Sequence, residues 1–349
     1  MDKAEIKRFS GRVFDDISAS MMVGLAYIGV KAGLFKGLEK IGPAKASALA
    51  AACGLQERYV LEWAKGMTAG GYIEHDPAAD TYHLSDEHAY LLASQGTDHF
   101  VGGMFLNSIA CLGVAPDVLE CFSAGGGVPF EAFGPCCIEA CDLASRGIYE
   151  ARLASYWLPQ MPEVIEKLER GGRVLDFGCG SGVAATVIAQ AFPAAHVVGL
   201  DVDESSIERA RELAKDASAK PEFVRVSSSD YEPDDGFDLI MAGDSVHDLA
   251  QPRETLADIR RLLKPDGTFF IIEPRAGDTL ADNTNPVGAM FYGFSVFHCM
   301  TQSLARDGAG LGACLGPAAI ESLVKEAGFS QFEVLDIKSP VNIFCAARP

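Results

Sequence analysis

The sequence predicts an α/β protein in which a smaller, mainly helical domain precedes a mostly parallel sheet. From residue 172 on, short apolar segments alternate with segments of helical spacing, as expected for a sheet with helices on both faces; these apolar segments are RVLDFGC, HVVGLDV, EFVRVSS, FDLIMAG and TFFIIEP. The last two apolar segments, FEVLDIKS and VNIFCAAR, are separated by little more than Pro340. This short separation predicts a closing antiparallel hairpin at one edge of the sheet.

Length and composition support more than one folded domain. The chain has 349 residues, whereas single hydrophobic cores usually stop growing at about 250 to 300 residues. Hydrophobic residues make up 48% of the chain and charged residues 22%, which is typical of folded proteins rather than disordered ones. We expect a helical domain over residues 1–95, a helical connecting segment over residues 96–160 and the α/β domain over residues 161–349.

The N-terminal domain has the pattern of a winged helix-turn-helix. Residues 18–38 have helical spacing, and residues 41–75 read as a helix, a turn at Gly54, a second helix and a short strand. Residues 72–75 and 81–84 are short strand-like pieces on either side of the turn-rich segment DPAAD. These two pieces predict the wing.

Charge argues against nucleic acid as a partner. The formal net charge is -19, and residues 1–95 carry 10 Lys and Arg against 12 Asp and Glu. The second helix of the motif, residues 56–69, mixes acidic and basic side chains; they are Glu57, Arg58, Glu62 and Lys65. A helix that binds phosphates needs a positive face, so we expect this domain not to bind DNA.

Cysteine usage and hydropathy indicate a cytoplasmic protein. Ten cysteines without a charged-then-apolar leader indicate reduced thiols rather than a disulfide framework. The longest apolar run, near residues 21–30, is shorter than the roughly 20 residues of a membrane span, so no membrane association is expected. Cys136, Cys137 and Cys141 form a cluster, but without further ligands at a suitable spacing we expect thiols there and no metal.

The segment VLDFGCGSG, residues 174–182, carries the strongest functional pattern. A buried-type strand runs into a turn with Gly178, Gly180 and Gly182 before a helix begins. Glycines allow a ligand to approach the backbone closely, and the helix N-terminus offers free N–H donors. Asp176 lies two residues before the first glycine, and Asp201 ends the next strand, where a carboxylate accepts both hydroxyls of a ribose.

The Gly-x-Gly-x-Gly spacing, together with Asp176 and Asp201, resembles class I S-adenosylmethionine-dependent methyltransferases; a nicotinamide-binding turn would place its third glycine at Val183. The resemblance implies a Rossmann-like seven-stranded sheet and S-adenosyl-L-methionine as the cofactor, with its methionine part along the loop. It also implies that Asp176 orients the amino acid end. The expected cofactor-binding residues are Asp176, Gly178, Cys179, Gly180, Gly182, Asp201, Val202, Asp230, Tyr231, Gly243 and Asp244.

Further motifs extend the resemblance over residues 172–275. After the third strand, Asp230 would accept the adenine amine, with Tyr231 flanking the ring; the alternative is that Asp230 caps a helix. After the fourth strand, Gly243 and Asp244 would lie beside the transferred methyl. The segment LLKPDGTFFIIEP is a further hallmark of this family. With a winged helix in front, the chain resembles bacterial small-molecule methyltransferases, in which that module serves in dimerisation and forms part of the pocket wall, so a homodimer is possible.

Methyl transfer to a hydroxyl requires a group that removes the proton. His247, just past the fourth strand, is our candidate general base, although it would equally suit a helix cap or packing on the sheet edge. Glu273 and His298 are the rivals, and His298 suits a pocket-lining or core position better. The aromatic segment 282–315 would form a lid over a small, partly hydrophobic acceptor, or it packs onto the core.

The sequence thus favours transfer of a methyl group to a small organic molecule, most simply to an oxygen. One alternative is a transcriptional regulator whose methyltransferase-like domain senses a ligand. Another is arsenite methylation, which requires the thiols of Cys136, Cys137 and Cys141 to converge.

Overall fold

The computed structural model describes residues 1–215 and 217–349, with the side chains of Pro135 and Cys136 left out. The described residues form two compact units. The first comprises Met1–Ala110 and Glu139–Gly147, and the second comprises Cys111–Ile138 and Ile148–Pro349. Each unit has a hydrophobic core of its own.

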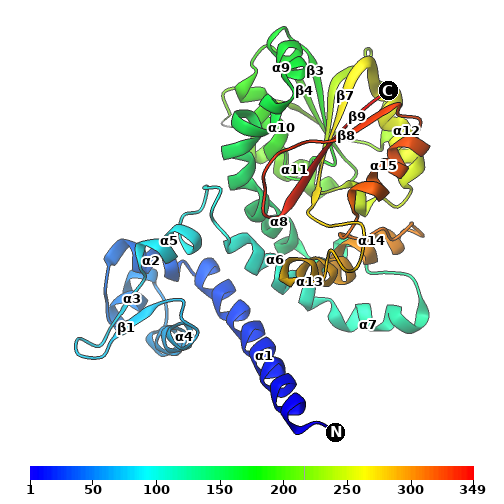
Figure 1. Cartoon of the computed structure of the whole chain (residues 1–349). Helices are drawn as coiled ribbons and strands as arrows, with labels where there is room; N and C mark the ends of the chain where they lie inside the picture. The colour runs from blue at the N-terminus through cyan, green and yellow to red at the C-terminus, as the bar shows by residue number, and fades with distance from the viewer. Residues whose placement is uncertain (216) are drawn as a thin grey trace. The chain divides into compact units, whose positions relative to one another are not determined.

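The first unit contains the predicted winged helix-turn-helix (Figure 1). Its elements are α1 (Lys3–Lys31), α2 (Leu34–Ile41), α3 (Ala46–Cys53), α4 (Glu57–Ala69), β1 (Glu74–Asp76), β2 (Thr81–His83), α5 (Asp86–Leu92) and most of α6 (Gly102–Gly113). Gly54 ends α3 with a φ of 68°, a left-handed conformation that glycine adopts without steric cost. β1 and β2 pair antiparallel and form the predicted wing. Phe35 and Trp63, packed edge to face at 5.3 Å, lie in the core of the unit.

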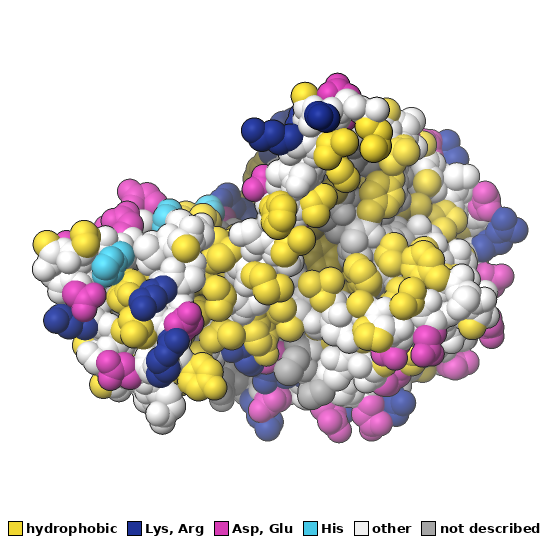
Figure 2. Space-filling model, turned by 90° about the horizontal axis from the view of Figure 1, so that it is seen from below, with side chains coloured by type: hydrophobic (Ala, Val, Ile, Leu, Met, Phe, Trp, Pro, Cys, Tyr) yellow, Lys and Arg dark blue, Asp and Glu magenta, His cyan; other side chains and the backbone are white. Residues whose placement is uncertain are grey.

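Helix α1 leaves much of its apolar surface exposed. Its exposed apolar side chains recur every three or four residues along much of the helix; they are Ile6, Phe9, Val13, Phe14, Ile17, Met21 and Ile28. Among the described residues, α1 is the one single helix that is long and apolar enough to cross a membrane. Only 11% of its most apolar 18-residue stretch is buried within the structure. Hydrophobic side chains are also abundant on the face of the molecule in Figure 2, where charged side chains lie mainly toward the margin.

The second unit is built on a seven-stranded sheet in the order β5-β4-β3-β6-β7-β9-β8. Its strands are β3 (Arg173–Phe177), β4 (His196–Asp201), β5 (Glu222–Arg225), β6 (Phe237–Gly243), β7 (Leu263–Pro274), β8 (Gln331–Val334) and β9 (Asn342–Arg348). β9 runs antiparallel to both of its neighbours, and the other pairs are parallel. The predicted mostly parallel sheet with a C-terminal antiparallel hairpin is therefore confirmed.

Helices cover both faces of this sheet, because its central strands present apolar side chains to both faces. Leu239 and Met241 face one core and Ile240 faces the other, as the two-residue period of a strand requires. The first core is covered by η2 (Tyr149–Trp157), α9 (Pro162–Glu169), α10 (Val183–Ala191) and α11 (Glu204–Leu213), and the second by α12 (Pro252–Leu262) and α15 (Pro317–Glu326). Figure 1 shows α9 and α10 on one side of the sheet and α12 and α15 on the other.

The remaining helical segments of this unit lie before β3 and after β7. Before the sheet come α7 (Ala115–Ala124), the short η1 (Phe130–Phe133) and helix α8 (Pro135–Ile148), which spans both units; η3 (Leu158–Gln160) follows η2. After β7 come α13 (Pro286–Phe294), the π-helix η6 (Ser295–Cys299) and α14 (Met300–Leu304). The segment GGGVPF packs on α14, since Val128 N donates to Thr301 Oγ1 at 2.8 Å and a side chain at Gly127 would overlap the Thr301 carbonyl.

Candidate active site

The chain order of the sheet changes direction at β3. The chain passes from β3 outward through β4 to β5, then returns to the other side of β3 with β6 and β7. At such a switch point the loops after neighbouring strands diverge and leave a crevice at their carboxyl ends, where ligands bind in open α/β sheets. The loops that follow β3, β4, β5, β6 and β7 carry the predicted site residues.

The glycine loop after β3 has the expected backbone. Gly178, Gly180 and Gly182 all have positive φ values of 65°, 51° and 73°. A side chain at Gly182 would also overlap the ring of Phe223, so that position requires glycine for conformation and for space. Gly182 caps α10 without a side-chain hydrogen bond, which leaves backbone N–H groups of the first helical turn for a ligand.

Asp176 and Asp201 accept hydrogen bonds from backbone N–H groups of α10 and of the glycine loop. Oδ2 of Asp176 accepts from Ala185 N at 3.0 Å, and Oδ2 of Asp201 accepts from Gly180 N at 2.9 Å. Burial raises the pKa of Asp176 to about 7, against the lowering effect of the Ala185 N–H group. Burial also raises the pKa of Asp201, although the N–H groups of Asp203 and Gly180 oppose the rise. A carboxylate oxygen can accept more than one hydrogen bond, so both groups have acceptor capacity beyond these bonds.

Ser245 supplies a polar atom that sequence reasoning missed. Its Oγ is buried, with no hydrogen-bond partner among the described residues. A Cβ built at Gly178 would lie 3.4 Å from this oxygen, so Ser245 packs directly against the glycine loop. A buried hydroxyl without a partner costs free energy, and an amino or carboxyl group of a ligand lying along the loop would supply the missing bond. The residues present therefore fit an amino acid moiety at this place.

The end of β6 is packed tightly against η2. A side chain at Gly243 would overlap the hydroxyl of Tyr149, which sequence reasoning did not single out. Burial raises the pKa of Tyr149 well above its usual value, and the nearby carboxylates of Asp244 and Asp176 raise it further. Asp244 follows with a φ of 50°, and its side chain is exposed. This end of the strand thus places a buried tyrosine hydroxyl and an exposed carboxylate close to each other.

The predicted adenine-side residues follow β5 and lie nearer to solvent. Asp230 ends η4 (Ser228–Asp230) and is exposed, and its Oδ2 accepts from Ser227 Oγ at 2.8 Å. Tyr231 is half-buried and stacks on Phe237 with ring centroids 6.3 Å apart. Val202, just after β4, is 49% exposed. Backbone pairing of Val226 N with Asp201 O at 3.1 Å keeps the start of this segment beside the end of β4.

His247 is buried and bonded to one of its two rivals. It lies on η5 (Val246–Asp248), and its Nδ1 is 2.6 Å from Oε2 of Glu273 in β7. The other carboxylate oxygen of Glu273 accepts from Val246 N at 3.0 Å. Burial alone would lower the pKa of His247, but Glu273 and then Asp248 raise it well above its usual value. A histidine held this way has one ring nitrogen, Nε2, that Glu273 does not occupy.

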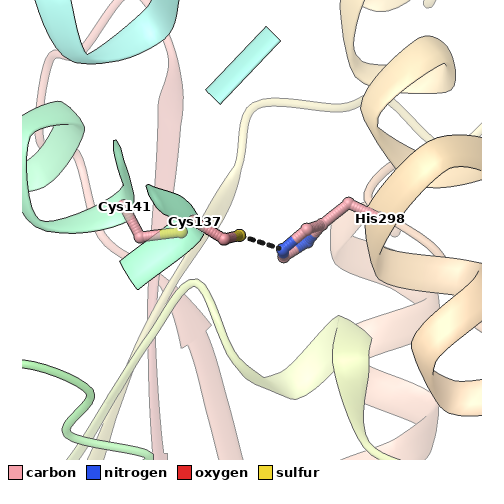
Figure 3. Close-up of side chains that lie close together, drawn as sticks. All are labelled: Cys137, Cys141 and His298. Atoms are coloured by element: carbon pink, nitrogen blue, oxygen red, sulfur yellow. Dashed lines mark hydrogen bonds between the residues drawn. The ribbon is translucent and has the colours of Figure 1, made fainter. Parts of the chain in front are cut away.

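The second rival, His298, faces a cysteine instead. Its Nε2 lies 3.5 Å from Sγ of Cys137 (Figure 3). Its Nδ1 lies 2.9 Å from the amide nitrogen of Gln302. The pairing joins residues 161 positions apart in the sequence, so no local motif could predict it. Cys136, which we grouped with Cys137, lies outside the described side chains.

One pocket of this unit lies away from the glycine loop. It has a volume of about 510 Å³ and opens between the loop after β7 and the connection of β8 to β9. Its lining mixes apolar and polar side chains, and the polar ones include Arg275, Asn283 and Asn342. Asn342 connects it to the candidate site, because its Nδ2 donates to Oδ1 of Asp244 at 3.4 Å.

Comparisons with known proteins agree with this geometry. Residues 168–305 match a family model described as a methyltransferase domain, and residues 18–94 match an Rv2258c-like winged HTH domain. A curated relative, the methyltransferase phqN of Penicillium fellutanum, is 29% identical over 173 residues, which are 49% of this chain and 49% of that protein. The chain spans about half the length, or less, of most of the curated relatives it matches.

Solved structures share the fold over the whole chain. A candidate O-methyltransferase from Nostoc punctiforme superposes with a TM-score of 0.74 at 18% identity, covering 97% of this chain and 98% of that one. Human N-acetylserotonin methyltransferase, solved with its S-adenosylmethionine, superposes with a TM-score of 0.65 at 18% identity, covering 100% and 98%. At these identities the likeness concerns the fold.

Proposed function

We propose that this chain, a class I S-adenosylmethionine-dependent methyltransferase with an N-terminal winged helix, transfers a methyl group to an oxygen of a small organic acceptor. The His247–Glu273 pair at the carboxyl ends of β6 and β7 carries this proposal. The bound cofactor supplies an activated methyl group on its sulfonium. The chain must then hold the acceptor in line and take up the hydroxyl proton.

Each part of the loop region has a role in this proposal. The N–H groups around Gly178, Gly180 and Gly182 contact the amino acid end of the cofactor, which Asp176 orients. Asp201 accepts the ribose hydroxyls with its remaining lone pairs. The other expected contacts lie along the adenine ring or beside the methyl; they are Cys179, Val202, Asp230, Tyr231, Gly243 and Asp244.

His247 acts as the general base through Nε2. Because Nδ1 faces a carboxylate, that nitrogen keeps its proton and leaves Nε2 to accept the proton of the acceptor hydroxyl. Glu273 stabilises the resulting imidazolium, which is why it raises the pKa of His247. Both oxygens of Glu273 are already engaged, by Val246 N and by His247 Nδ1, so we assign Glu273 to positioning His247. His298 lies beside Cys137 and Gln302, whereas His247 has a carboxylate partner that stabilises its imidazolium.

Two measurements test this function. Isothermal titration with S-adenosylmethionine checks cofactor binding, and mass spectrometry of a metabolite extract incubated with enzyme and cofactor reveals the methylated acceptor. His247→Ala should abolish most turnover and leave cofactor affinity within about twofold, while the exposed His196→Ala control retains activity. Full turnover of a folded His247→Ala variant would refute the assigned base. Absence of cofactor binding by the wild-type chain would refute the function itself.

We further propose that α1 pairs with a second copy of the chain. Its apolar side chains recur at a spacing that forms one stripe on a helix, and Phe9, Phe14 and Met21 are each at least 65% exposed. Exposed stripes of this size are costly in water and mark contact surfaces. A second α1 has the same stripe, so a symmetric pairing buries both. The nine described cysteines form no disulfide with one another, which supports a cytoplasmic location.

A further inference from the structure

We propose that His247, Asp248 and Cys299 form a binding site for one Zn²⁺ ion. Each of these residues offers one ligand atom, and the three atoms lie within 4.8 Å of one another. Imidazole nitrogen, carboxylate oxygen and thiolate sulfur are the protein ligands that zinc prefers. Three protein ligands and an open fourth position characterise zinc sites that also bind water or a substrate.

The three residues come from two elements that the fold brings together. His247 and Asp248 lie on η5 after β6, and Cys299 is the last residue of the π-helix η6 after β7. π-Helical turns are rare and occur frequently at functional sites. His247 and Cys299 are buried, so the site is shielded from the competing carboxylates of the acidic surface.

Asp248 has an unsatisfied oxygen that points to a ligand. Its Oδ1 is buried and has no hydrogen-bond partner among the described residues, although it lies 3.3 Å from Nε2 of His247. An unpaired buried carboxylate oxygen costs free energy, because it has lost its bonds to water without gaining others. A cation between this oxygen and the imidazole would remove that cost.

The separation of the ligand atoms suits tetrahedral coordination. Zinc bonds of about 2.0 Å to nitrogen and oxygen and about 2.3 Å to sulfur place neighbouring ligands roughly 3.3 to 3.8 Å apart. His247 Nε2 and Asp248 Oδ1 already have that separation at 3.3 Å. The Cys299 sulfur, within 4.8 Å of both ligand atoms, needs to move inward by no more than about 1.5 Å.

Glu273 provides the outer support that zinc-binding histidines have. A metal-ligating histidine almost always donates its other ring N–H to a carboxylate or carbonyl, which fixes the ring and raises its basicity. Here Nδ1 of His247 lies 2.6 Å from Oε2 of Glu273, and Val246 N holds the other oxygen of that carboxylate. The ring therefore presents Nε2 toward Asp248. On binding, the proton of the Cys299 thiol passes to solvent, and Nε2 of the neutral imidazole donates its lone pair to the metal.

Zinc would occupy the nitrogen that serves as the general base in the proposed function. Bound Zn²⁺ therefore inhibits methyl transfer reversibly, although binding itself depends only on the geometry of the three ligands. A spectroscopic measurement of metal binding tests the metal site independently of the role of His247 as general base. Zinc binding without inhibition would overturn the role of His247 as the base and leave the metal site intact.

The test uses the full-length protein after treatment with a chelator. Titration with Co²⁺ should give a thiolate-to-cobalt charge-transfer band in the near ultraviolet that saturates at one equivalent and disappears on addition of Zn²⁺. Cys299→Ser should abolish the band. The matched control Cys121→Ser, on α7, should retain it, because that thiol bonds only to the carbonyl of Asp117 one turn earlier.

If Cys299→Ser does not fold, the zinc affinities of two other variants test the proposal. In competition with a coloured chelator, Asp248→Asn should weaken zinc binding at least about 100-fold, and Glu273→Gln by about 10- to 100-fold. No cobalt band in the wild-type protein, or a band that persists in Cys299→Ser, would overturn the proposal. A band lost in Cys137→Ser but retained in Cys299→Ser would do the same, since it would place the metal beside His298.

Discussion

Nδ1 of His247 lies 2.6 Å from Oε2 of Glu273, and both side chains are almost completely buried. Glu273 lies near the end of β7, and His247 lies on η5, four residues after the neighbouring strand β6 ends. The bond from Val246 N to the other oxygen of Glu273 also holds η5 against β7. A carboxylate in this position fixes the tautomer of the imidazole and stabilises its protonated form. This pair is the most direct structural support for proton removal at the site.

Glu273→Gln should therefore reduce kcat on the order of 100-fold, because the amide no longer stabilises the imidazolium. Cofactor affinity should change little, since Glu273 contacts η5 and not the glycine loop. Steady-state kinetics with the identified acceptor and titration calorimetry measure the two quantities. Glu333→Gln, an equivalent change on the exposed β8, is the control. Equal kcat values for Glu273→Gln and wild type would contradict a role for the pair.

Gly243→Ala should lower the free energy of unfolding by about 1 to 3 kcal/mol, because the added methyl overlaps the hydroxyl of Tyr149. Tyr149→Phe removes that hydroxyl and should restore most of the loss in the double variant. Chemical denaturation of the four proteins gives the coupling between the two positions. Additive effects in this cycle would show that the two residues do not touch.

Asp176 should make the cofactor-free protein less stable as the pH rises. Its pKa is raised by burial to about 7 in the folded state, from 3.8. The folded state therefore holds a proton that the unfolded state has lost between these values, and stability falls through that range. The effect is on the order of 4 kcal/mol.

Asp176→Asn keeps an oxygen that accepts from Ala185 N but does not ionise. The variant should gain stability relative to wild type as the pH rises from about 4 to about 7. Denaturation curves at several pH values measure this difference. A stability difference that does not vary with pH would show that Asp176 titrates at its ordinary value.

The apolar stripe of α1 should determine the oligomeric state. Phe9→Lys combined with Ile17→Lys should convert a dimer into a monomer, because charges cannot be buried against a second apolar stripe without a large cost. Ser10→Lys combined with Ser18→Lys adds the same charge at exposed positions of the same helix and should leave the dimer intact. Light scattering gives the mass. A monomeric wild-type protein would eliminate this surface as a dimer contact.

The sequence by itself determined the fold and the position of the cofactor loop. Both depend on local order along the chain: alternating strands and helices, glycines at fixed spacing, and a carboxylate at the end of the next strand. Gly178, Gly180 and Gly182 have the positive φ values that their spacing predicts, and Asp201 accepts from the amide of Gly180 inside that loop. Short-range patterns of this kind need no knowledge of distant contacts.

Only the tertiary structure decided which groups meet at the candidate site. Sequence reasoning treated Glu273 as a rival of His247, whereas the sheet makes the two partners. Tyr149, Ser245 and Cys299 have no motif around them, and they reach the site because separate segments pack against the ends of β6 and β7. Contacts between residues far apart in sequence depend on how strands align and helices pack, which no local pattern encodes.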